Sequence, residues 1–408
     1  MRKVSKRLLV RSLVLGMIVL AIYFTHKVSQ SLAITCPDEK AKEILKDLCQ
    51  LYEGNQVDGN LCYDLCQTES IQYVSCFNYH KGKVVFRGSW NGRPVIMKSK
   101  YSHLSDYPHP FASVMDKEGV MKTVIPDMAL FTSMVYHQVQ GQFGFELGMT
   151  EEHLLKHMWK SKDNTDDKET TEGLTNADIV SLWALLQQEE YIVYKFWNHF
   201  HHFPKIYGMC GHFYFLEYVP PGYILNPSAI SMQHQLASLP WLNRAKVAMS
   251  MMEFLSAVDD QFPEKLHLCD VKHNNFGVTQ DWVVKAIDVD ITFFQNQLDT
   301  TLNQPECTSA EDCHFFDCKG SCNATSRRCN SQRSNTNLQA VCADIFSRHY
   351  GTPGLLRLPP TQVAKQLDSV LQECLQQKGL PSSTKISETT VYQRLLEVLK
   401  TSLQYVER

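Results

Sequence analysis

The sequence has no excess of charge of either sign. Its 408 residues include 40 Lys and Arg against 43 Asp and Glu, which gives a formal net charge of −3. A protein that binds nucleic acid through a general electrostatic field is basic, so this balance excludes nucleic acid as a partner. The chain is not short of apolar residues, since 44% are hydrophobic and 11% aromatic. That content can bury one large core or two smaller ones, which excludes disorder as the default state.

The 14 cysteines lack the pattern of a zinc finger. Cys62 and Cys66, like Cys318 and Cys322, have metal-like spacing, but neither pair has the matching Cys/His pair at finger distance. Most of the cysteines fall in two clusters: Cys36, Cys49, Cys62, Cys66 and Cys76, then Cys307, Cys313, Cys318, Cys322, Cys329 and Cys342. Such clusters favour a disulfide framework in an oxidising compartment, with zinc as the alternative. Cys269 lies outside both clusters, and we expect a free thiol there.

One long apolar run occurs, at residues 13–24, directly after a basic N-terminus. Residues 8–25 approach the ~20 residues of a membrane span if Arg11 extends to the interface. The basic residues predict a cytosolic segment 1–11, an uncleaved anchor at 12–25 and a lumenal bulk, with the membrane as a partner. The alternative is a signal peptide that is cleaved after Ala33.

A glycosylation sequon supports the lumenal placement. Asn323 begins an Asn-Ala-Thr sequence inside the second cysteine cluster. This predicts an exposed, glycosylated lumenal loop at that position.

The strongest chemical pattern lies at residues 266–290. Asp270, Lys272 and Asn275 have the spacing of a protein-kinase catalytic loop, and an apolar strand at 283–287 ends in Asp288. Phosphoryl transfer needs a carboxylate near the attacking hydroxyl and cations that neutralise phosphate charge. We therefore interpret Asp270 as the catalytic base, Lys272 as a contact to the transferred phosphate, and Asn275 and Asp288 as ligands of Mg²⁺ or Mn²⁺. A polar turn between strands is the alternative interpretation.

Upstream, residues 83–98 predict a β-hairpin whose second strand ends at Lys98, where a kinase carries its nucleotide lysine. Alternatively, Lys98 is a solvated charge at a strand end. The expected glycine-rich phosphate loop is missing, since only Gly82 and Gly88 are available. Its absence argues against high nucleotide affinity.

Residues 150–197 read as two helices, at 150–159 and 176–197, joined by an acidic loop. This is the plan of an EF-hand, with Asp167, Glu169, Thr171 and Asp178 as calcium ligands. The register is poor, because Glu172 stands where the turn glycine belongs. A solvated acidic loop without calcium is the alternative.

The second of these helices carries Glu190, the predicted partner of Lys98, with Glu189 as the alternative. Two strands follow, ending in a hinge at 217–219. Three histidines, His199, His201 and His202, either bind metal or are polar packing at a helix end. Further helices are predicted at 244–262, 363–375 and 391–403 from their apolar spacing.

In this order of parts the chain resembles the divergent protein kinase domain 1 family. These are cysteine-rich type II membrane proteins of the early secretory pathway, with an EF-hand-like insert inside a protein-kinase fold. The likeness runs from the cysteine-rich segment at 26–78 through residues 182–187 and 268–270 to the cysteine loop at 307–342. It implies an α+β, bilobal kinase-like fold with disulfide-rich loops in the endoplasmic reticulum. The implied N-lobe is 79–219, with an insert at about 150–185, and the C-lobe is 220–408.

The resemblance also implies ATP with Mg or Mn as cofactor, and calcium in the insert. By likeness to kinases, Lys98, Glu190, Asp270, Asn275 and Asp288 take the family roles. Leu-Cys-Asp at 268–270 and Asp-Val-Asp at 288–290 replace the usual His-Arg-Asp and Asp-Phe-Gly, and no Ala-Pro-Glu occurs. Losing the arginine removes a usual anchor for a phosphorylated activation loop.

Two functions are consistent with these features. One is a lumenal kinase that phosphorylates hydroxyl groups of proteins or glycans. The other is a pseudokinase scaffold that keeps the fold without catalysis. Retention of the acidic, amide and basic residues favours the kinase, whereas the missing glycine-rich loop favours the scaffold.

Overall fold

The computed structural model describes residues 36–79, 83–115, 119, 121–159, 173–220, 239–303, 306–347, 354–376 and 385–405. The predicted anchor at 12–25 lies outside these ranges. Within them, no helix combines the length and apolar character that crossing a bilayer requires.

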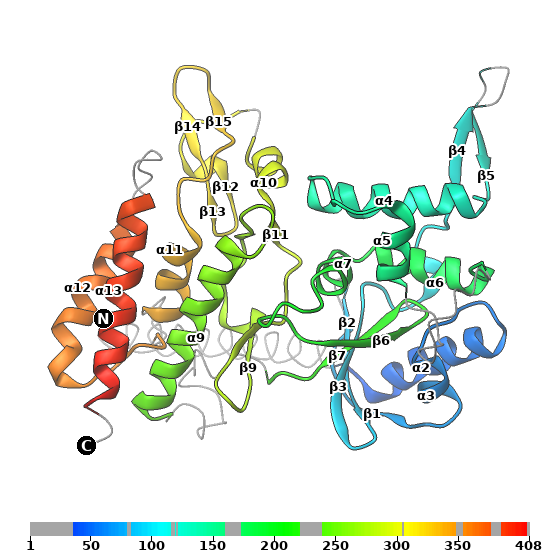
Figure 1. The fold of residues 1–408 in the computed structure, drawn as a ribbon, viewed down its shortest axis with the longest axis horizontal. Coiled ribbons are helices and arrows are strands. Elements are labelled where there is room, and N and C mark those ends of the chain that lie inside the picture. The colour runs from blue at the N-terminus through cyan, green and yellow to red at the C-terminus, as the bar shows by residue number, and fades with distance from the viewer. Residues whose placement is uncertain are drawn as a thin grey trace, which may run out of the picture.

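A five-stranded antiparallel sheet forms one half of the molecule (Figure 1). Its strands, in spatial order, are β1 (Ile71–Asn78), β2 (Val84–Trp90), β3 (Arg93–Ser99), β7 (Phe213–Glu217) and β6 (Ile206–Cys210). The predicted hairpin is confirmed: Asn91 and Gly92 connect β2 to β3 with φ of 49° and 82°, the left-handed geometry that an Asn-Gly turn provides. The sheet begins at Ile71, so the cysteine-rich segment contributes its edge strand.

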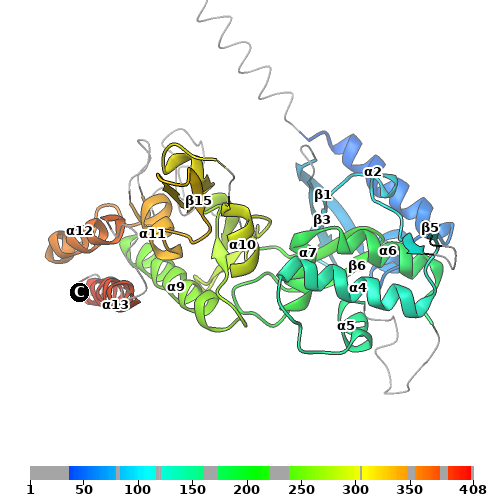
Figure 2. The same ribbon diagram turned by 90° about the horizontal axis from the view of Figure 1, so that it is seen from above.

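Helices cover both faces of this sheet (Figure 2). On β7, Phe213 and Phe215 pack into a core with the N-terminal helices α2 (Asp38–Glu53) and α3 (Cys62–Cys66). The alternate residues Tyr214 and Leu216 face the larger core on the other side. This period of two is what a strand buried on both faces requires. The helices of that second side are α4 (Met128–Phe143), α5 (Glu151–Met158), α6 (Asn176–Leu186) and α7 (Glu189–Phe196).

The predicted helix at 150–159 is confirmed. Its first turn is capped by Thr150, whose hydroxyl accepts the His153 N–H at 3.3 Å.

The prediction of one continuous helix over 176–197 is wrong. Gln188 has an extended backbone and separates α6 from α7. Its side-chain amide donates to the carbonyls of Ala184 and His212, at 3.2 and 2.8 Å, and its side-chain oxygen accepts the Lys100 N–H at 2.8 Å. The bonds to His212 and Lys100 join distant parts of the chain and are absent from any local pattern, and they compensate for the broken helix.

The other half is mainly helical and lies at the far end of the molecule from the sheet (Figure 1). Its helices are α9 (Trp241–Asp260), α11 (Asn337–Val341), α12 (Thr361–Gln376) and α13 (Lys385–Leu403). The helices predicted at 244–262, 363–375 and 391–403 correspond to α9, α12 and α13. The mixed helix and sheet content predicted from the sequence is therefore present.

Short elements lie between the two halves and above them. The strand pairs are β8 (His267–Leu268) with β11 (Thr292–Phe293), β9 (Phe276–Val278) with β10 (Val284–Ala286), β12 (His314–Phe315) with β13 (Cys318–Lys319), and β14 (Ser321–Asn323) with β15 (Arg328–Asn330). Helix α10 (Gln295–Leu302) precedes the cysteine-rich hairpins. A separate hairpin, β4 (Ala112–Met115) with β5 (Met121–Val124), projects beyond α4 (Figure 1).

All 14 cysteines form disulfides. The pairs are Cys36–Cys76, Cys49–Cys66, Cys62–Cys210, Cys269–Cys318, Cys307–Cys322, Cys313–Cys329 and Cys342–Cys374. The predicted disulfide framework is confirmed, and zinc is not its basis, because each metal-spaced pair is split between two bonds. Three of the seven bonds join a cysteine of a cluster to one that lies outside both clusters: Cys210, Cys269 or Cys374.

The Cys62–Cys210 bond joins the N-terminal helices to the sheet, and the backbone around it is closely packed. A Cβ on Gly208 would stand 2.4 Å from the side-chain oxygen of Asn60. That oxygen accepts the Met209 N–H at 2.9 Å. Glycine at 208 therefore lets the cysteine-rich segment bind directly against β6.

Because a disulfide constrains the unfolded chain more when it closes a longer loop, the bonds should differ in their contribution to stability. Cys62 and Cys210 are 148 residues apart, whereas Cys307 and Cys322 are 15 apart. Replacing Cys62 and Cys210 together by Ala should lower the free energy of unfolding by about 2–5 kcal/mol. The matched Cys307→Ala/Cys322→Ala variant should lose less. Urea unfolding followed by tryptophan fluorescence measures both, and an equal or reversed order would contradict the expectation.

Candidate functional site

Two lysines project from the same face of the sheet. Val85 of β2 lies directly opposite Lys98 of β3. Val85 packs against the larger core, so alternation places Lys83, two residues earlier, on this same face. Residues diagonal to each other on neighbouring strands are within reach of long side chains. The β2–β3 register therefore brings two ammonium groups to one place.

Lys98 is buried and pairs with Glu190 in the first turn of α7. The side chain of Lys98 is 8% exposed and that of Glu190 is 2% exposed. The Lys98 ammonium donates to Oε1 of Glu190 and, at 2.7 Å, to the carbonyl of Ile287. The alternative partner, Glu189, binds Lys100 instead, at 3.0 Å near the surface. The sheet, α7 and the strand before Asp288 thus meet at one lysine.

Lys83 lies among three carboxylates. Its Nζ is 2.9 Å from Oε2 of Glu190, 3.0 Å from Oδ1 of Asp288 and 2.9 Å from Oδ2 of Asp290. Oxygens of the three acids lie within 4.8 Å of one another. The sequence reasoning missed Lys83 and Asp290. Asp290 was visible as the second acid of Asp-Val-Asp, but no local pattern marks Lys83.

This clustering shifts the ionisation of the groups. Burial opposes the charge on Glu190, but Lys83 and Lys98 outweigh it and lower the pKa of that carboxyl. Burial likewise opposes the charge on Lys83, yet the three acids raise the pKa of its ammonium above the ordinary value. Burial, assisted by Glu190, raises the pKa of Asp290 to about 6. At neutral pH the cluster therefore holds Glu190 and Lys83 in their charged forms.

The predicted catalytic loop forms a hydrogen-bonded turn after β8. Lys272 donates to Oδ2 of Asp270 at 2.6 Å. The Asn275 amide, at the end of a 3₁₀ turn, donates to the same oxygen at 2.8 Å and to the Asp270 carbonyl at 2.9 Å. The structure therefore brings together the three residues that the Asp-x-Lys-x-x-Asn spacing selected.

The catalytic loop is bonded to the segment that carries Asp288. The Asn275 carbonyl accepts the N–H of Ile287 at 2.8 Å and that of Asp288 at 3.3 Å. Ile287 is also the carbonyl that Lys98 contacts. A continuous path of contacts thus runs from Lys98 through Ile287 to Asn275 and Asp270.

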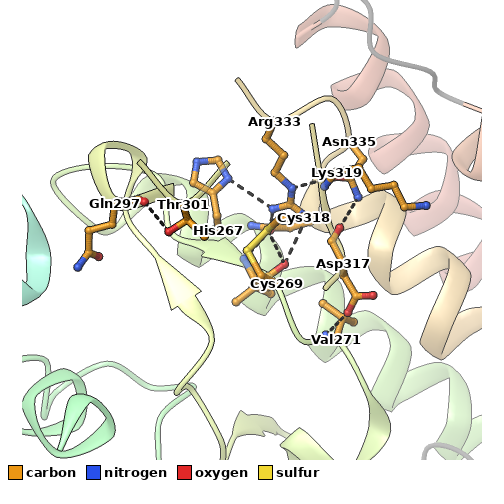
Figure 3. The surroundings of a disulfide bond; sticks show 12 residues. His267, Cys269, Val271, Gln297, Thr301, Asp317, Cys318, Lys319, Arg333 and Asn335 are labelled. Atoms are coloured by element: carbon orange, nitrogen blue, oxygen red, sulfur yellow. Dashed lines mark hydrogen bonds between the residues drawn. A yellow bond between two sulfur atoms is a disulfide. The ribbon is translucent and has the colours of Figure 1, made fainter. Parts of the chain in front are cut away.

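The cysteine-rich loop holds the catalytic loop from the other side (Figure 3). Cys269 is bonded to Cys318, and the neighbouring Asp317 carboxylate accepts the Val271 N–H at 2.5 Å. The Asp317 N–H in turn donates to the Cys269 carbonyl at 2.8 Å. Both residues that flank Asp270 are therefore fixed by one short segment.

Two polar residues near α11 complete this support. Asn337 accepts the Leu268 N–H at 2.9 Å and donates to the Leu266 carbonyl at 2.8 Å. Arg333 donates to Asn337 at 2.7 Å and to the Leu268 carbonyl at 3.3 Å. Asn337 and Arg333 therefore satisfy backbone N–H and carbonyl groups of the strand that precedes the catalytic loop.

The prediction of a free thiol at Cys269 is wrong. Its side chain is fully buried and bonded to Cys318, with the two Cα atoms 4.8 Å apart. The error arose because the second cluster folds back over the catalytic loop, an approach between residues 49 positions apart. Asp317, Arg333 and Asn337 were missed for the same reason.

Of the four predicted calcium ligands, Asp167, Glu169 and Thr171 lie outside the described residues. Asp178 caps α6: its carboxylate accepts the N–H and the hydroxyl of Thr175 at 2.8 and 2.6 Å. A calcium site at this loop stays a prediction.

The histidines near α7 differ in their surroundings. His202 is buried, and its Nδ1 lies 2.8 Å from the Val284 carbonyl. Burial lowers the pKa of His202. In the described part of the chain, none of the three histidines belongs to a group with metal-ligand geometry.

The arrangement offers three chemical features. Two ammonium groups can bind an anion, and carboxylate and amide oxygens can bind a hard cation. A separate acid, Asp270, lies beside a lysine. Mg²⁺ and Mn²⁺ prefer oxygen ligands of this kind. Lysines near a carboxylate turn suit phosphate oxygens. Asn275 directly precedes β9, and Asp288 lies just after β10, the strand paired with β9. The carboxylate and the side-chain amide oxygen therefore lie on adjoining segments, so the residues fit a metal-bound nucleotide.

Two family models match the chain. Residues 2–158 match the model described as the N-terminal, cysteine-rich, endoplasmic-reticulum region of FAM69. Residues 182–377 match the model described as the protein-kinase domain of FAM69. The second match includes Glu190, the catalytic loop and the cysteine-rich hairpins, and the first includes both lysines.

The buried ion pair gives a test with a matched control. Glu190→Gln leaves two ammonium groups without their shared counter-charge, so it should lower the free energy of unfolding by about 3–5 kcal/mol. Glu189→Gln removes only the surface pair with Lys100 and should cost less than about 1 kcal/mol. Denaturant unfolding of the two variants beside wild type measures the difference. Equal small losses would mean that the lysines do not depend on Glu190.

Proposed function

Because the chain belongs to the FAM69 family of cysteine-rich proteins with a protein-kinase domain, we propose that it is an ATP-dependent phosphotransferase. It transfers the γ-phosphoryl group to a hydroxyl of a protein or glycan. The sheet half acts as a kinase N-lobe and the helical half as a C-lobe. The observation that carries this proposal is the path of contacts from Lys98 and Glu190 through Ile287 to Asn275 and Asp270.

Each residue has a role set by its neighbours. Lys98 is held by Glu190 with its ammonium toward the segment of Asp288, where it binds phosphate oxygens. Asn275 and Asp288 hold Mg²⁺ or Mn²⁺, which neutralises charge on the phosphates when bound. Asp270 takes the proton of the acceptor hydroxyl, and Lys272, 2.6 Å from it, faces the transferred phosphate.

A pseudokinase scaffold is the second candidate, and a specific observation favours it. Lys83 engages Asp288 and Asp290, so one of the acids expected to bind metal already has a cationic partner. The sequence also lacks a glycine-rich phosphate loop. Nucleotide binding and transfer by the same purified protein separate the two candidates.

The family and Asn323 support a location in the lumen of the endoplasmic reticulum. One family model describes an endoplasmic-reticulum region, and we place the bulk of the chain in the lumen as a type II protein. Asn323 supports this, because it is exposed at the β14–β15 hairpin. Its side chain caps only the neighbouring turn, accepting the N–H groups of Thr325 and Ser326 at 3.0 and 3.1 Å.

The catalytic assignment predicts three different outcomes. Asp288→Asn should weaken the divalent-dependent part of ATP binding. Asp270→Asn should leave ATP binding intact while transfer falls by about 10²–10⁴-fold, as for a lost acid–base group. Lys98→Met should reduce both, because its ammonium contacts phosphate in the ground state and in the transition state alike.

These outcomes are measured by ATP titration with and without Mg²⁺ or Mn²⁺, and by phosphate transfer to a panel of protein and glycan acceptors. A scaffold gives no transfer for any variant. If the wild-type protein binds no ATP with any divalent ion, and Asp288→Asn changes nothing, the enzyme assignment is wrong.

The topology makes a separate prediction. Asn323→Gln should increase gel mobility and remove sensitivity to endoglycosidase when the full chain is expressed in secretory cells. Unchanged mobility would count against glycosylation at Asn323. A mature N-terminus at Ile34 would establish cleavage in place of an anchor.

A further inference from the structure

Lys83 contacts three carboxylates at once, whereas a surface ion pair joins one cation to one acid. Each contact uses one oxygen from a different carboxylate, at 2.9–3.0 Å. The ammonium donates hydrogen bonds to Asp288 and Asp290 and forms an ion pair with Glu190. The Lys83 side chain is only 18% exposed. The ammonium therefore stands inside the triangle formed by Glu190, Asp288 and Asp290.

The same triangle has the composition of a divalent-cation site. Mg²⁺ and Mn²⁺ are bound by carboxylate oxygens, and these oxygens lie within 4.8 Å of one another. A metal ion at this position would need the oxygens that Lys83 already engages. Lys83 and a divalent ion are thus alternative occupants of one position.

The contacts of the three acids favour the lysine as the occupant, because each of them already has an oxygen within 3.0 Å of the Lys83 ammonium. The two oxygens of Glu190 are divided between the lysines, Oε1 to Lys98 and Oε2 to Lys83. A cavity of about 50 Å³ borders the cluster and is lined by Lys83, Glu190 and Asp290 among others. Small ions can therefore reach this position, and Lys83 does not occupy it merely because ions are kept out.

We propose that Lys83 is a built-in cation of the nucleotide site, filling the place between Glu190, Asp288 and Asp290 that a divalent ion would take. With Lys98 it places a second ammonium group at the nucleotide site, and it does so without a glycine-rich loop. Lys83 contacts Oδ1 of Asp288, so the ion proposed with Asn275 uses the other oxygen. The nucleotide part of this inference rests on the proposed function, whereas the occupancy of the triangle does not.

Manganese binding to the nucleotide-free protein tests the occupancy directly. The full chain in detergent is titrated with Mn²⁺ and the free ion is measured by electron paramagnetic resonance. Lys83→Met should bind one Mn²⁺ at least about tenfold more tightly than wild type, because a buried positive charge is removed from the ion's position. Lys83→Arg, which keeps the charge, and Lys100→Met, which removes a neighbouring lysine outside the triangle, should resemble wild type. Lys83→Met with no gain in affinity would overturn the proposal.

A second comparison begins in the wild-type chain, where it does not depend on the folding of Lys83→Met. Asp290→Asn in the otherwise wild-type chain should leave Mn²⁺ affinity unchanged, since the triangle holds a lysine and not an ion. In the Lys83→Met background the same change should abolish the gained site. If Asp290→Asn weakens Mn²⁺ binding in the wild-type chain, the triangle is a metal site and the proposal is wrong.

ATP binding in EDTA tests the role toward the nucleotide. Wild type should retain measurable ATP binding without divalent ions, whereas Lys83→Met should bind ATP only when Mn²⁺ is added. A wild-type protein that binds ATP strictly with divalent ions would overturn this role. If no form binds ATP under any condition, the proposed function fails, and the Mn²⁺ titration still decides whether Lys83 occupies the triangle.

Discussion

The buried contact between Lys98 and Glu190 is the interaction on which the rest of the site depends. It joins β3 to α7, and through the Ile287 carbonyl it also fixes the segment that carries Asp288. A buried ion pair adds little net stability, because desolvation offsets the attraction, but leaving one partner alone is costly. The pair therefore fixes how β3 and α7 are placed relative to each other. A different register of β3, or a rotated α7, would bury an uncompensated charge.

Local patterns in the sequence predicted those parts of the site that are close together in the chain. Asp270, Lys272 and Asn275 lie within six positions, and the turn that joins them is made by their own hydrogen bonds. The β2–β3 hairpin was equally predictable, since Asn91 and Gly92 provide the backbone geometry of the turn. In such cases the spacing of residue types carries the three-dimensional information.

The remaining features depend on contacts between distant segments, which one sequence does not reveal. Gln188 ends a helix that its own apolar pattern would continue, because His212 and Lys100 offer better partners than the next turn does. Cys269 looked isolated because Cys318 approaches it only after the second cluster folds back. Lys83 looked like any strand-end lysine, although three acids from two other segments surround it.

The connection between Cys62 and Cys210 has a consequence for biosynthesis. Because 148 positions separate the two residues, the Cys62 thiol must wait while the intervening chain is synthesised, with Cys49 and Cys66 close to it in sequence. Exchange between neighbouring thiols and disulfides proceeds through thiolate attack, so early mispairing inside the first cluster competes with the native bond. Maturation of the sheet half is thus coupled to thiol–disulfide isomerase activity. Its yield should follow the redox poise of the compartment more closely than the intrinsic folding rate of the sheet.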